Sequence, residues 1–127
     1  MQFDNKITHR LGEDAHTMNQ QAKENMQKLQ MYEQSLQNFL LQRQNHQAQL
    51  SEVSSALKEL EATDDAYQII GNVMVKKSKD ELKKHLEERK ETAEIRIQSI
   101  EKQEVKVREK IEALQKDMME EMKNAGA

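Results

Sequence analysis

Residues 63–81 read TDDAYQIIGNVMVKKSKDE, and this stretch decides which fold the chain can adopt. The run Thr63-Asp64-Asp65 ends helices and favours turns. Two β-branched runs follow it, separated by Gly71-Asn72, and Gly71 can supply the positive φ of a type II′ turn. The stretch therefore predicts a β-hairpin.

A two-residue turn would give this hairpin two largely apolar faces. One face would carry Gln68, Ile70, Val73 and Val75, and the other Tyr67, Ile69, Met74 and Lys76. A lone two-stranded hairpin is marginally stable in water, and its open edges invite pairing. Since only two helices adjoin it, we favour burial between subunits over burial within the chain. The partner strands would come from other copies or from related subunits.

Apolar residues at coiled-coil spacing extend outward from the hairpin in both directions. Before it, the seam positions are Ala15, Met18, Ala22, Asn25, Leu29, Tyr32, Leu36, Phe39, Arg43, His46, Leu50, Val53, Leu57 and Leu60. After it, they are Leu86, Lys90, Ala93, Ile97, Ile100, Glu104, Val107, Ile111, Leu114 and Met118. We expect a fold dominated by α-helix, a long antiparallel coiled-coil helical hairpin with a single β-hairpin at the bend.

Three segments follow from these patterns. Residues 1–61 form the first helix of the coiled coil, 62–78 the oligomerisation hairpin and 79–127 the second helix. Ser78 and Glu81 fit a capping box that starts the second helix. Whether the first dozen or so residues form regular helix is left open.

The composition excludes several functional classes. The 127 residues include no proline, no cysteine, no tryptophan, 34% charged residues and 3% aromatic residues. Such a chain suits uninterrupted helices rather than a compact enzyme, and it offers no disulfide or thiolate site. The net charge of −3 argues against nucleic-acid binding. No run is apolar enough for a membrane span or a secretory signal, so we expect neither.

No catalytic, cofactor or metal site is predicted. His9, His16, His46 and His85 lack the spacing of a metal motif, and we expect all four on the solvated helix surface. The many carboxylates fit helix flanks, because acid–base catalysis would need a water-excluding cleft that this architecture lacks.

Besides Asn25, four charged or polar residues interrupt the seam: Arg43, His46, Lys90 and Glu104. We favour the interpretation that their long side chains snorkel to the surface. The alternative is that they specify the register or soften the arm. Antiparallel pairing could bring Arg43 within about a turn of Glu104, but the sequence alone does not set that register.

The stretches Ala56–Glu61, Asp64–Tyr67, Ile70–Lys76 and Lys79–Leu82, together with the heptads around them, resemble the β-type subunits of prefoldin. The order helix, single hairpin, helix is also that of the β class, whereas the α class carries two hairpins. The resemblance covers roughly residue 20 to the end of the chain.

The resemblance implies a co-chaperone without nucleotide chemistry or cofactor. It implies a cytoplasmic heterohexamer of two α-type and four β-type subunits whose hairpins assemble into β-barrels. Unfolded client proteins would be held near the coiled-coil tips and passed to a group II chaperonin. The barrel-forming hairpin residues would be Tyr67, Ile69, Ile70, Gly71, Val73, Met74 and Val75.

The tips, where the two chain ends meet, would carry the client-binding residues. The candidates are Phe3, Ile7, Leu11, Met18, Met118, Met119 and Met122. Flexible methionines suit a surface that adapts to many clients, and we favour client contact for Met118, Met119 and Met122. The alternative is that Met118 closes the seam and the other two lie on a frayed helix end. For Phe3, Ile7 and Leu11, client binding and simple end-capping of the coiled coil both stay open.

A structural alternative is a generic coiled-coil scaffold that joins copies through its hairpin. An enzyme would require a site that the sequence does not contain.

Overall fold

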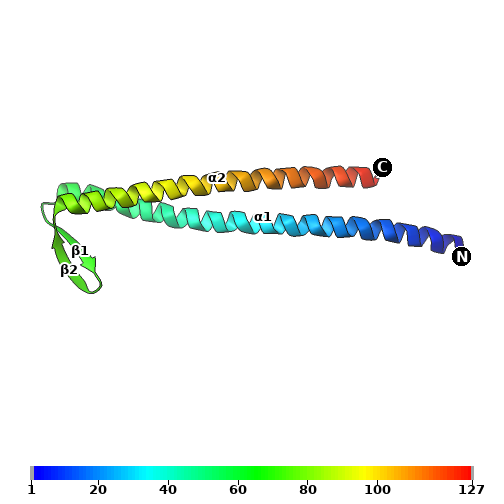
Figure 1. Ribbon diagram of the computed structural model, residues 1–127, viewed down its shortest axis with the longest axis horizontal. Helices are drawn as coiled ribbons and strands as arrows, with labels where there is room; N and C mark the ends of the chain where they lie inside the picture. The colour runs from blue at the N-terminus through cyan, green and yellow to red at the C-terminus, as the bar shows by residue number, and fades with distance from the viewer. Residues whose placement is uncertain (1, 127) are drawn as a thin grey trace. The chain divides into compact units, whose positions relative to one another are not determined.

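A computed structural model describes the backbone of residues 2–126 and the side chains of residues 20–124. Helix α1 (Gln2–Ala62) is followed by strands β1 (Ala66–Ile70) and β2 (Val73–Lys77) and by helix α2 (Lys79–Gly126). The predicted fold class, two long helices joined through one β-hairpin, is confirmed (Figure 1).

Both helices continue without a break because no proline interrupts them. Helix α1 stops after Ala62, where the Thr63 hydroxyl donates to the carbonyl of Glu59 at 3.2 Å. No basic residue lies in its last turn, but the Lys79 ammonium donates to the carbonyl of Glu61 at 3.3 Å. A residue at the start of α2 therefore stabilises the negative end of the α1 dipole.

Helix α2 begins as its capping residues predict. The backbone N–H of Glu81 donates to the Ser78 hydroxyl at 3.1 Å, and that of Leu82 donates to the Ser78 carbonyl at 3.1 Å. Asp80 and Glu81 add negative charge to the first turn, where the helix dipole favours it.

The hairpin has the predicted two-residue turn. Ile70 pairs with Val73 and Gln68 with Val75, in an antiparallel register that continues to Ala66 and Lys77. Gly71 has a φ of 60°, which a residue with a Cβ adopts only with strain. The faces are therefore those inferred from the sequence, with Ile69 and Met74 paired on the second one.

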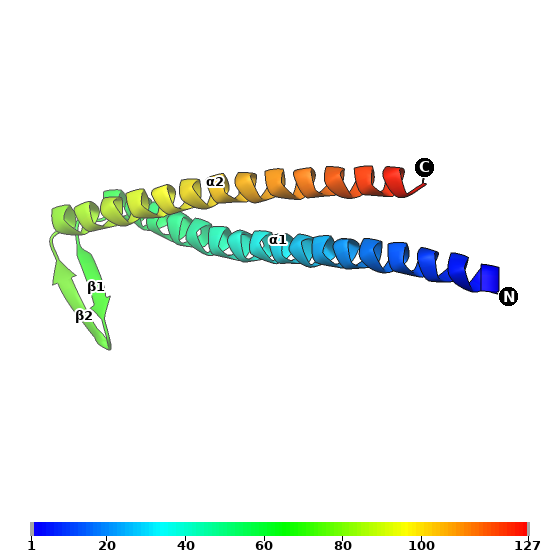
Figure 2. The same cartoon turned by 45° about the vertical axis from the view of Figure 1, so that its right-hand side comes forward.

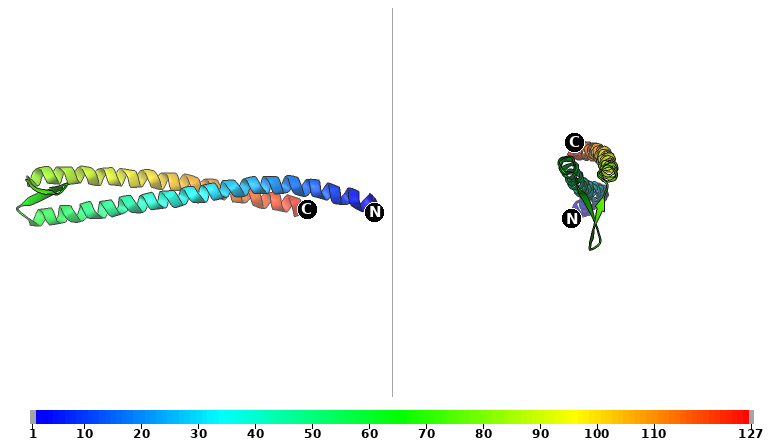
Figure 3. Two further views of the ribbon diagram at one scale, coloured as in Figure 1. Left: turned by 90° about the horizontal axis from the view of Figure 1, so that it is seen from below. Right: turned by 90° about the vertical axis from the view of Figure 1, so that its left-hand side faces the viewer.

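The chain divides into two compact units. The hairpin unit comprises Asn38–Glu104, and the terminal unit comprises the chain up to Gln37 with the chain from Val105 onward. The strands project from the hairpin unit where α1 and α2 are connected (Figure 2). Seen along the helix axes, β1 and β2 lie to one side of the helical pair of the hairpin unit (Figure 3).

The core of the hairpin unit is small and includes a cluster at the base of the hairpin. Val53 and Leu60 of α1 and Leu86 of α2 are buried against Ala66, the first residue of β1. Ala56, Leu57 and Leu82 pack against this cluster. The hairpin is thus anchored to the helices at its base, while the rest of its side chains contribute little to this core.

The seam follows the predicted spacing in the hairpin unit. On α2 the buried positions are Leu86, Ala93, Ile97, Ile100 and Glu104. On α1 the half-buried or buried positions include Phe39, Leu50, Val53, Leu57 and Leu60. Spacings of three and four residues therefore bury one stripe of each helix.

An ion pair lies inside this seam. The Arg43 guanidinium donates from Nε to Oε1 of Glu104 at 2.7 Å, and Glu104 is only 3% exposed. The interpretation that these two side chains snorkel to the surface is wrong. Glu104 is too short to reach solvent from the seam, so the longer Arg43 side chain meets it there.

The terminal unit has polar residues in its seam as well. Glu121 accepts hydrogen bonds from Nε2 of Gln21 at 2.7 Å and from Nδ2 of Asn25 at 3.2 Å. Asn25 is buried, and the Lys110 ammonium lies 6.0 Å from the centre of the Tyr32 ring. These contacts join α1 to α2 within the terminal unit.

We expect Arg43→Ala to lower the free energy of unfolding by about 2 kcal/mol, because it removes the guanidinium from a buried carboxylate. Urea unfolding of the full chain, followed by far-UV circular dichroism, measures this loss. Arg89→Ala, at an exposed position of α2, is the control and should change stability by less than about 0.5 kcal/mol. The double variant Arg43→Met, Glu104→Met should recover most of the loss. Equal stability of Arg43→Ala and the original chain would show that the pair does not support the seam.

Candidate functional site

The hairpin carries six exposed apolar side chains, which we call the hairpin surface: Tyr67, Ile69, Ile70, Val73, Met74 and Val75. Their exposed fractions range from 37% to 70%, although apolar side chains of this size are usually buried. Three of them lie on each face of the two-stranded sheet. Neither face of the hairpin is therefore covered within the described part of the chain.

The hairpin also offers hydrogen-bonding groups along its edges. Because the pair Ile70–Val73 closes the turn, the backbone N–H groups of Tyr67, Ile69, Met74 and Lys76 point away from the partner strand. The described sheet has only the strands β1 and β2, so both are edge strands. Edge groups beside exposed apolar faces form a template for another strand.

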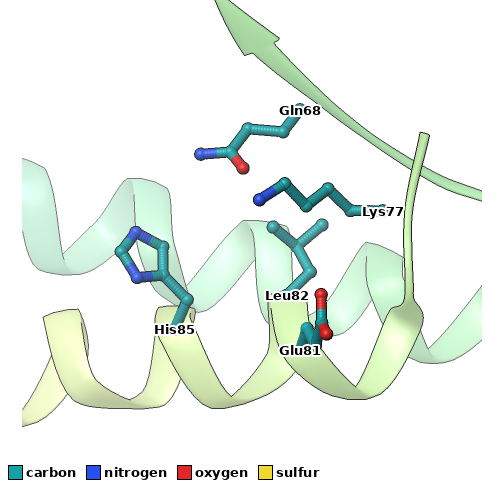
Figure 4. Close-up of a pocket in the computed structure, with 5 residues that line it drawn as sticks. All are labelled: Gln68, Lys77, Glu81, Leu82 and His85. Carbon is teal, nitrogen blue, oxygen red and sulfur yellow. The ribbon is translucent and has the colours of Figure 1, made fainter. Parts of the chain in front are cut away.

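A shallow groove lies between the hairpin and α2, with a cavity volume of about 190 Å³. Gln68 and Lys77 of the hairpin lie across it from Leu82, Glu81 and His85 of α2 (Figure 4). Leu82 also packs against the core of the hairpin unit. The groove therefore lies between α2 and the face of the hairpin that carries Gln68.

A second groove, of about 410 Å³, is lined by Gln49, His85, Glu88, Arg89, Thr92, Ala93 and Arg96. Among residues 20–124, no three His, Asp or Glu side chains come close enough to hold a metal ion. Within the same part of the chain, neither helix has a stretch long and apolar enough to span a membrane.

One histidine does not lie where the sequence analysis placed it. His46 is half-buried in the seam, and its Nδ1 atom is buried without a hydrogen-bond partner among the described residues. The expectation of a solvated position is wrong for His46, because its place in the heptad turns it toward α2. His85 is exposed, whereas the side chains of His9 and His16 lie outside the described residues.

The terminal unit carries the predicted methionines in two environments. Met119 and Met122 are 66% and 75% exposed, and they lie three residues apart on one face of α2. Met118 is half-buried at a seam position. The side chains of the other candidates, Phe3, Ile7, Leu11 and Met18, lie outside the described residues.

A further methionine, which the sequence analysis missed, joins this group from α1. Asn25 bonds Glu121 across the seam, and Met26 and Met122 are the next residues in the two helices. In an antiparallel pair, the positions that follow these seam residues lie on the same side of the seam. Met26 is 48% exposed there. The signal was present in the heptad, since Met26 directly follows the seam residue Asn25.

We call Met26, Met119 and Met122 the methionine surface. Their thioether side chains are unbranched and polarizable, so they can adapt to apolar partners of different shape. Exposed large apolar side chains that gather on a helical pair are typical of an interaction site.

Comparison with known proteins identifies the family. The family model described as "Prefoldin subunit" matches residues 13–125. The chain is 40% identical over 93 residues to prefoldin subunit beta of Archaeoglobus fulgidus, covering 71% of this chain and 80% of that protein. It is 42% identical over 89 residues to the corresponding subunit of Pyrococcus furiosus, covering 68% and 76% of the two chains.

A solved structure agrees with both the fold and the relatives. The crystal structure of the prefoldin beta subunit from Thermococcus strain KS-1 superposes with a TM-score of 0.74 and 34% sequence identity. The match covers 79% of this chain and 90% of that one. The two long helices, the single β-hairpin between them and these matches together show that the chain belongs to the prefoldin family, among its β-type subunits.

Proposed function

We propose that this chain binds unfolded proteins through the ends of its coiled coil and delivers them to a group II chaperonin without ATP. Prefoldin subunits are non-enzymatic co-chaperones that assemble with other prefoldin subunits. We further propose that the chain acts in the cytoplasm, as part of a hexamer of two α-type and four β-type subunits.

The observation that carries the proposal is the presence of two separate exposed apolar surfaces. The hairpin surface belongs to the hairpin unit, and the methionine surface belongs to the terminal unit. The hairpin surface combines apolar faces with free strand edges. Strands of other subunits would form hydrogen bonds with these edges, and their side chains would cover the apolar faces. The methionine surface has no such edges, so it suits weak contacts with many different chains.

Several subunits in one assembly would multiply those weak contacts. A client held by several coiled coils at once is bound far more tightly than by one, because later contacts are intramolecular. No nucleotide is needed for such binding. Release follows when a second protein competes for the same weak contacts.

We expect the double variant Ile69→Asp, Val73→Asp to prevent assembly while leaving helicity nearly unchanged. One carboxylate is placed on each face of the hairpin, where burial against another subunit would leave it desolvated. Native mass measurement after co-expression with an α-type prefoldin subunit reports assembly. Ile95→Asp, at an exposed apolar position of α2, is the control and should assemble normally. If the double variant also assembles normally, the hairpin is not the interface.

We expect the triple variant Met26→Ser, Met119→Ser, Met122→Ser to suppress client aggregation less well than the original assembly. Removing three apolar side chains from the contact should raise the amount needed for half-maximal suppression by roughly tenfold. Light scattering of a chemically denatured client measures this, with native mass measurement as the check on assembly.

Met31→Ser is the matched control for this triple variant. Met31 is also exposed, but it points about 140° away from Met26 around α1. It should leave suppression unchanged. Full suppression by the triple variant would place the client site elsewhere, and a generic scaffold would suppress no aggregation in any form.

A further inference from the structure

Methionine is the only sulfur-containing residue of this chain, since the sequence has eight methionines and no cysteine. The three thioethers of the methionine surface are exposed to solvent, Met122 most of all at 75%. Small oxidants reach exposed thioethers readily, and no thiol of this chain competes for them. Any oxidation of sulfur in this chain therefore takes place at a methionine thioether.

We propose that the methionine surface is a reversible oxidation site that switches off client binding. The oxidant is hydrogen peroxide. The thioether sulfur attacks one peroxide oxygen, the O–O bond breaks, and a sulfur–oxygen bond forms. The second oxygen leaves as water with both hydrogens, so sulfur loses two electrons and the peroxide gains them. This inference rests on the proposed client-binding function of the same residues.

The product changes the property on which client binding depends. A sulfoxide is polar and chiral, whereas the thioether is apolar and adapts to its partner. Covering a sulfoxide with an apolar client segment would bury its oxygen without a hydrogen-bond donor. Because Met119 and Met122 share one face of α2 and Met26 lies across the seam from Met122, the three sulfoxides would affect one contact.

The fold distinguishes these thioethers from their neighbours. Met118 is half-buried at a seam position, so it should be oxidised more slowly than Met119 beside it. Met74 is exposed in the free chain but belongs to the hairpin surface. It should be protected once another subunit covers that surface. Oxidation of the assembled protein should therefore leave the subunit interface intact.

The test treats the assembled protein, made from the full chain and an α-type subunit, with hydrogen peroxide. Peptide mass measurement should show one added oxygen on Met26, Met119 and Met122 before Met118. The oxidised assembly should keep its mass apart from the added oxygens, and it should require roughly tenfold more protein for half-maximal suppression of client aggregation. Treatment with methionine sulfoxide reductases and a thiol reductant should restore suppression.

The triple variant Met26→Leu, Met119→Leu, Met122→Leu separates this site from every other methionine. Leucine carries no sulfur to oxidise, so peroxide should change the amount of this variant needed for half-maximal suppression by less than about twofold, measured against the same variant before treatment. Met31→Leu, the control, should lose suppression on oxidation as the original protein does. The inference is overturned if the oxidised original assembly still suppresses fully, or if the triple leucine variant is inactivated equally. An assembly that fails to suppress aggregation before any oxidation would instead overturn the proposed function.

Discussion

Two helices in contact bury only one seam, and this constraint determines how the remaining apolar residues are used. In the hairpin unit the seam and Ala66 form a small core. The remaining apolar side chains of β1 and β2 have no helix left to cover them. A chain of this design must either leave its strands uncovered or bury them against another subunit, and prefoldin subunits assemble with one another.

The polar residues of the seam give the helical pair its register. A wholly apolar seam tolerates a shift of one helix by a heptad, because the packing energy of a leucine–isoleucine contact is close to that of a leucine–leucine contact. The contacts of Arg43 with Glu104 and of Asn25 with Glu121 are lost by such a shift. Glu104 would then be buried away from its guanidinium, at a large cost in desolvation. Each unit therefore contains a polar contact that favours one alignment of its two helices.

Local chemistry made much of this fold predictable. The turn at Gly71, the cap at Ser78 and the heptad spacing each depend on neighbours in the sequence, and the structure contains all three. The contact of Arg43 with Glu104 joins residues 61 positions apart, so it depends on an interhelical register that no local pattern encodes. The heptad marks Met26 as the neighbour of a seam residue, but its grouping with Met119 and Met122 depends on the same interhelical register.

The central claim is that part of this chain's apolar core is completed by other subunits, and hydrogen exchange tests it most directly. The outward N–H groups of Tyr67, Ile69, Met74 and Lys76 can be compared in the isolated chain and in the assembly with an α-type subunit. We expect these amides to exchange rapidly in the isolated chain and to become protected on assembly, with the seam amides around Ile97 changing little. Equal exchange of these hairpin amides in both states would contradict the claim.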